Sequence, residues 1–108
     1  MTPLAIIVTE PAGARLLGAL TLAAAAAALG RDVAMLFDGG SVVALGPAAE
    51  PGIAAALATA RDLGVSITAC QSGLAAAGLA ATALPEGTVG GGMIGFLAAH
   101  VDAQLLLG

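Results

Sequence analysis

Short apolar segments alternate with longer, alanine-rich segments along this chain, and that alternation limits its fold more than any other feature. Leu4–Val8 is a continuous apolar run, the pattern of a strand buried on both faces of a sheet. Further strands are predicted at 32–37, 65–69 and 103–107. Strands that alternate with helices predict a mostly parallel sheet with right-handed crossovers. The length of 108 residues suits one domain, 1–108.

The segments between the predicted strands carry helix signals. The first helix is expected to begin at Pro11, which suits a first turn, and to stop at Gly30. A second helix is expected to follow Pro51-Gly52 and to end near Leu63-Gly64, and two more are expected over 72–81 and 93–100. The segment 41–45 fits either a short strand or one helical turn, and 85–92 is predicted to be a glycine-rich connection.

Polar residues follow each of the first three predicted strands. Because the carboxyl ends of parallel strands share one edge, where ligands gather, these residues are expected on one rim. The candidates are Glu10 after the first strand, Asp38 and Gly39 after the second, and Cys70 and Ser72 after the third. Cys70 is the candidate for covalent chemistry and the other four are candidates for binding. Glu10 and Asp38 are also a possible acid–base pair, although Asp38 before two glycines is equally typical of a turn.

Cys70 is the only cysteine and the only side chain with obvious covalent chemistry. If the next helix begins near Ser72, its free amide groups and dipole favour the thiolate by about 0.3–1 kcal/mol. Carboxylates at Glu10 and Asp38 act in the opposite direction, so we expect a moderately reactive thiol. The alternative is an inert core residue, since free cysteine is often buried.

Two other features have simpler explanations than catalysis. The segment 90–95 matches G-x-G-x-x-G, but the chain ends before the acidic residue that a dinucleotide site needs about 20 positions later. A flexible turn or close packing is therefore favoured over anion binding there. His100 ends a predicted helix, where a cap is favoured over a general acid or base.

The low charge of the chain excludes several classes of protein. It has no lysine, three arginines and a formal charge of −4, whereas nucleic-acid binding relies on clustered positive charge. Mean hydropathy is +1.04, but the best apolar segment, 16–30, is shorter than the roughly 20 residues of a membrane span. One cysteine and one histidine are too few for a closed metal site. No membrane span, metal or cofactor is expected.

Only 9% of the residues are charged, so little polar surface is available to cover a small domain. We therefore expect a homo-oligomer with the alanine-rich first helix as a contact surface, the alternative being scattered and harmless exposure. A single cysteine and the lack of a basic leader before the first apolar run favour a cytoplasmic location.

The segments 19–30 and 31–37 with the turn at 40–42 resemble the DsrE/DsrF-like family of small sulfur-relay proteins. So does 63–70, with Gly78 eight residues beyond the cysteine. The resemblance covers almost the whole chain. It implies a three-layer α/β/α fold with a five-stranded, mainly parallel sheet, assembled as trimers or hexamers. It also implies that Cys70 takes sulfane sulfur from a donor protein as a persulfide and passes it to an acceptor protein.

One position departs from the family pattern. Several sulfur-transferring members have an arginine just before the glycine that matches Gly78, and this chain has Ala77 there. The cation that would steady a persulfide anion is missing. Two hypotheses follow: a sulfur carrier or sulfurtransferase-like protein that uses Cys70, or a non-catalytic oligomeric assembly or small-ligand-binding subunit of the same fold with an unreactive Cys70.

Overall fold

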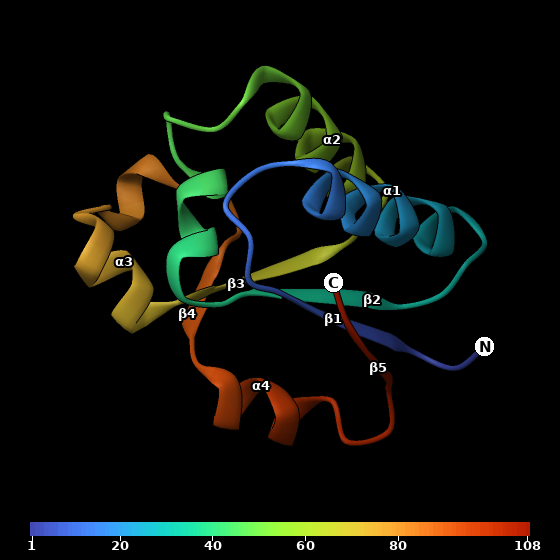
Figure 1. Ribbon diagram of the computed structural model, residues 1–108. Helices are drawn as coiled ribbons and strands as arrows, with labels where there is room; N and C mark the ends of the chain where they lie inside the picture. Colours follow the sequence, from blue (N-terminus) through green and yellow to red (C-terminus); the bar gives the residue numbers. More distant parts are fainter.

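Helices cover the two faces of a five-stranded sheet unequally in the computed structural model, which describes residues 1–108 (Figure 1). All neighbouring strands are parallel, in the order β4-β3-β2-β1-β5. The strands are β1 (Leu4–Val8), β2 (Val33–Phe37), β3 (Ser66–Cys70), β4 (Val89–Gly91) and β5 (Gln104–Leu107). The helices are α1 (Ala14–Ala28), α2 (Pro51–Asp62), α3 (Gln71–Ala77) and α4 (Met93–Ala99), with 3-10 helices η1 (Gly39–Leu45) and η2 (Ala81–Ala83). This architecture confirms the predicted α/β fold with a parallel sheet.

The alternation of side chains along each strand divides the core into two clusters. Leu4, Ile6 and Val8 of β1 belong to a cluster of 21 buried residues beneath α1, α2 and η1. Ala5 and Ile7 point to the other face and belong to a cluster of five, which α4 covers. The strand is buried along its whole length, as its continuous apolar run predicts. No helix is both long and apolar enough to cross a membrane.

Three helices end in the same way. Gly30, Gly64 and Gly78 follow α1, α2 and α3 with φ angles of 95°, 95° and 67°. Each glycine N–H donates to the carbonyl three residues earlier, and the next N–H donates to the carbonyl five residues before it. This is the Schellman arrangement, which favours glycine because its φ is positive. The predicted stop at Gly30 is confirmed, and the expected 72–81 helix is wrong at its end because Gly78 turns the chain.

The predicted start of the first helix at Pro11 is wrong. Pro11 lies in a bend, and α1 begins at Ala14 after Gly13, whose φ of 93° is not helical. The N–H of Gly13 donates to Glu50 Oε1 at 3.1 Å. A carboxylate 37 residues away in the sequence therefore accepts a hydrogen bond from the amide that precedes the helix.

The two segments that the sequence left open or irregular are both ordered. The segment 41–45 is part of η1, where the fully buried Ser41 hydroxyl lies 2.8 Å from Asp38 O and 3.1 Å from Val8 O. The expected connection 85–92 contains β4, which pairs with the last three residues of β3. Two of its three residues are glycines, so no strand pattern marks it.

Candidate functional site

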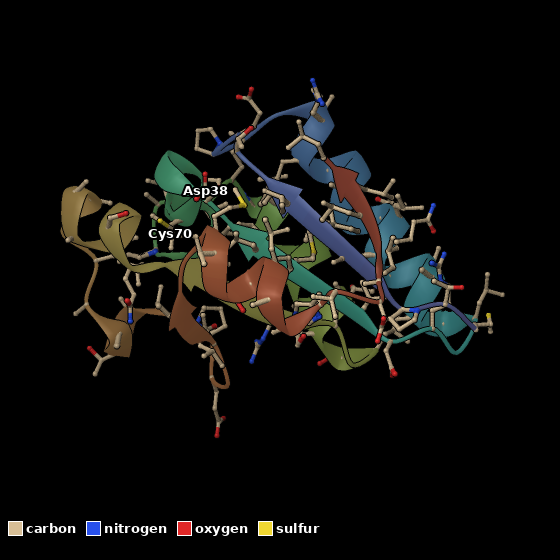
Figure 2. The ribbon with its side chains drawn as sticks, turned by 90° about the horizontal axis from the view of Figure 1, so that it is seen from below. Asp38 and Cys70 are labelled. Atoms are coloured by element: carbon tan, nitrogen blue, oxygen red, sulfur yellow. The ribbon has the colours of Figure 1, made fainter.

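Cys70 lies where β3 gives way to α3, as the sequence predicts. It is the last residue of the strand and the N-cap of the helix. Its Sγ accepts a hydrogen bond from the Gly73 amide at 3.4 Å and lies 3.2 Å from Ser72 Oγ. The sulfur therefore takes the role that an oxygen of serine or aspartate usually has at a helix start. Figure 2 shows Cys70 and Asp38 at the same end of the sheet.

These neighbours change the acidity of the thiol. The Ser72 hydroxyl is the largest cause of a lowered pKa at Cys70, followed by the backbone of Gly39 and the Gly73 amide. Burial and the negative charge of Asp38 oppose the shift, but the pKa stays below that of an ordinary cysteine. Hydrogen bonds to the charged form thus outweigh desolvation, and the thiolate is favoured.

A close approach between two glycines builds this arrangement. A Cβ placed on Gly73 would collide with the Gly39 carbonyl oxygen and lie 3.0 Å from its carbon. Only glycine at position 73 lets the first turn of α3 lie directly against the start of η1. The contact brings both backbones that lower the Cys70 pKa next to the sulfur. Sequence reasoning missed Gly73, although a glycine three residues after the cap position was a usable signal.

Cys70 is mostly buried but not sealed. Its side chain is 7% exposed and lines an open depression of about 490 Å³. The residues around this depression come from the ends of β2, β3 and β4 and from the starts of α3 and α4: Asp38, Cys70, Gln71, Ser72, Gly91, Gly92, Met93, Ile94 and Gly95. A small reagent therefore has a path to the wall that contains the thiol.

Four of the five residues predicted for the rim gather here and one does not. Asp38 and Ser72 line the depression with Cys70, and Gly39 acts on the sulfur through its backbone. Glu10 is exposed beyond the end of β1, which β2 separates from β3, and it does not line the depression. The structure joins Asp38, not Glu10, to the thiol.

The positive side chains lie elsewhere. Arg31 donates from Nε to Thr2 O at 2.7 Å and from Nη2 to Gln104 Oε1 at 2.8 Å. Arg61 donates to the Glu86 carbonyl. Arg15 lines a separate depression between α1 and β5. No arginine borders the Cys70 depression, and no group of three or more His, Cys, Asp or Glu residues is placed to hold a metal ion.

The glycine-rich segment 90–95 and His100 have the structural roles that the sequence favours. A Cβ on Gly90 would lie 3.2 Å from Gln71 Nε2, and one on Gly91 would lie 3.0 Å from Thr68 Cγ2. The glycine-rich segment thus supports close packing beside the depression. His100 is the C-cap of α4, and its ring lies 4.5 Å from that of Phe96 between centroids.

Comparisons with known proteins identify the fold but not the family. No family model matches the sequence, and no curated protein is significantly similar to it. Among solved structures, YchN from E. coli is similar with a TM-score of 0.84 and 20% identity, over 99% of this chain and 98% of that one. MTH1491 from Methanobacterium thermoautotrophicum, a protein of unknown function, has a TM-score of 0.85 and 16% identity over the whole of both chains. At these identities the likeness shows a shared fold alone.

Proposed function

We propose that the protein is a sulfur carrier that holds sulfane sulfur as a persulfide on Cys70. The observation behind this proposal is a thiol that ends β3, accepts a hydrogen bond from the Gly73 amide, lies 3.2 Å from the Ser72 hydroxyl and lines an open depression. The resemblance of the surrounding sequence to the DsrE/DsrF-like family and the shared fold support it. A single free cysteine also suits a reducing, cytoplasmic compartment.

The chemistry needs a thiolate that both attacks and leaves. For loading, the Cys70 thiolate attacks the outer sulfur of a donor persulfide R–S–SH. A new S–S bond forms at Sγ, the donor S–S bond breaks, R–S⁻ leaves and the proton stays on the outer sulfur. For delivery, an acceptor thiolate attacks that outer sulfur and Cys70 leaves as the thiolate. A lowered pKa makes Cys70 a better leaving group and raises its thiolate fraction at a given pH above that of an ordinary cysteine.

Intact-mass measurement after incubation with a sulfane donor tests this proposal. We expect the wild type to gain the mass of one sulfur atom and to lose it on reduction, while Cys70→Ser gains nothing. Ser72→Ala keeps the thiol but removes the largest cause of its lowered pKa, so it should load more slowly at neutral pH. A wild-type protein that gains no sulfur would overturn the proposal.

One observation favours the alternative, a non-catalytic assembly or ligand-binding subunit. The Cys70 side chain belongs to the main core cluster. In that role the thiol would react with a neutral thiol reagent only after unfolding. Labelling that is fast in the native protein supports the carrier, and labelling that appears only with denaturant supports the subunit.

We also propose that the chain forms a homo-oligomer through the surface around α4. Large apolar side chains are highly exposed there: Ile94 is 87% exposed, Val101 77% and Leu107 71%. On α1, which the sequence favoured as the contact surface, Leu17 and Leu22 are 44% and 47% exposed, and only Leu29 at the C-cap, at 72%, is comparable. Exposed apolar area of this kind is typical of an interface.

A further inference from the structure

The Asp38 carboxylate is the one charged group beside the Cys70 sulfur. Asp38 follows β2, Cys70 ends the neighbouring β3, and both line the same depression (Figure 2). The Asp38 side chain is half-buried and does not cap η1, although the residue occupies the N-cap position. Its charge therefore remains available to whatever approaches the sulfur.

The opposite wall adds no compensating charge. The start of α4 contributes glycines together with Met93 and Ile94, which are apolar. The arginines lie outside the depression, two of them hydrogen-bonded to Thr2, Gln104 and Glu86. A molecule that reaches Sγ meets amide groups, a hydroxyl, apolar side chains and one negative charge.

We propose that Asp38 makes this depression select sulfur donors without negative charge beside the transferable sulfur and reject anionic donors such as thiosulfate. This inference rests on the proposed function of Cys70 as a sulfur acceptor. An anionic donor must bring its charge close to both the thiolate and the Asp38 carboxylate. Repulsion between like charges a few ångströms apart near a protein surface lowers the rate of encounter by about tenfold. An uncharged or cationic persulfide avoids that repulsion.

A pair of thiol reagents that differ in charge isolates this effect. The trimethylammonium-ethyl methanethiosulfonate is cationic and the sulfonato-ethyl one is anionic, but both react in the same way. The thiolate attacks the sulfur that carries the ethyl group, a disulfide forms and methanesulfinate leaves. The rate constant of the cationic reagent with Cys70 is divided by that of the anionic reagent. This ratio is then divided by the same ratio for N-acetylcysteine amide, which gives the normalised ratio. We expect a normalised ratio of about ten that decreases as salt screens the charges.

A matched pair of variants separates Asp38 from the net charge of −4. Asp38→Asn and Glu10→Gln each remove one negative charge, but only Asp38 lines the depression. We expect Asp38→Asn to lower the normalised ratio about threefold or more and Glu10→Gln to leave it unchanged. A wild-type ratio near one, a ratio insensitive to salt, or equal shifts in the two variants would overturn the inference. If Asp38→Asn fails to fold, Asp38→Ser removes the same charge and replaces it in the comparison with Glu10→Gln.

Sulfur loading then distinguishes this inference from the proposed function. Cysteamine persulfide, whose amine is cationic, and thiosulfate, which transfers its outer sulfur and releases sulfite, are compared at equal concentration by intact mass. Faster loading from cysteamine persulfide is expected, and faster loading from thiosulfate would overturn the inference but leave the carrier function standing. If the normalised ratio of the thiol reagents is high but Cys70 gains sulfur from neither donor, the carrier function is overturned while the charge selection at the thiol stands.

Discussion

One face of the sheet is closed by this chain itself, whereas the other is thinly covered. Beneath α1, α2 and η1 lie 21 buried residues in one cluster, but α4 covers only five. The two most exposed large apolar side chains, apart from Met1, lie in or just after α4: Ile94 is 87% exposed and Val101 77%. The α1–α2 face therefore contains most of the buried core, and the α4 face is the one that we propose as the contact surface. The Cys70 depression lies between them, because β3 and the start of α4 both border it.

Leu20→Ala should give the largest effect and tests the closed face. Leu20 is fully buried in α1 within the main cluster. Truncation leaves a cavity in tightly packed surroundings, so we expect the free energy of unfolding to fall by about 3–5 kcal/mol. Urea unfolding at several protein concentrations measures it, and the loss should not depend on concentration.

Phe96→Ala makes the equivalent change on the thin face. Phe96 is 4% exposed, and its buried neighbours are two alanines, an isoleucine and a leucine. A short helix over a small cluster can settle into the space, so we expect a loss of about 2–3 kcal/mol, below the range of about 3–5 that is usual for such a change. A cost equal to that of Leu20→Ala in the same urea experiment would mean that the two faces contribute alike.

Val101→Glu tests whether the α4 side is the contact surface. We expect the dissociation constant of the oligomer to rise about tenfold or more, which corresponds to about 1.4 kcal/mol. The stability of the isolated subunit should change by no more than about 0.5 kcal/mol, because the side chain is exposed. Sedimentation velocity measures the association. Leu22→Glu on α1 is the control, and dissociation by that variant alone would move the interface to the closed face.

The smallest effect concerns the thiol between the two faces. The pKa of Cys70 is lowered in the folded protein, first by the Ser72 hydroxyl, so the unfolded chain binds more protons at intermediate pH. The stability of the wild type relative to Cys70→Ser should therefore rise with pH between the folded and unfolded pKa values. It should be lost as the pH falls through the folded value. Urea unfolding across pH measures this, and a difference that is flat or falls with pH would contradict the hydrogen-bond network.

The predictable parts of the fold are those fixed by local chemistry. Leu4–Val8 is apolar throughout because both of its faces are buried, so the strand is evident from the sequence. Gly30 ends a helix because its φ of 95° favours a residue without a side chain. The position of Cys70 at a strand end follows from the predicted strand 65–69 before it.

The rest depends on contacts between distant segments. β4 is a strand because Val89, Gly90 and Gly91 lie beside Thr68, Ala69 and Cys70, not because of its own residues. α1 begins only after Gly13, whose N–H is bonded to the distant Glu50 carboxylate. The contact between Gly73 and Gly39 is invisible until β2 and β3 are neighbours. For the same reason the sequence placed Glu10 and Asp38 on one rim but could not tell which of them lies beside the sulfur.

The strand order has a consequence for local opening of the sheet. β4 and β5 form its opposite edges, yet they are consecutive strands joined only through α4 and short connections (Figure 1). If α4 detaches, both edges lose their link at once, so they are expected to open as one cooperative unit. Amide hydrogen exchange at the two edges should then report the same opening free energy, and the three inner strands between them should exchange more slowly.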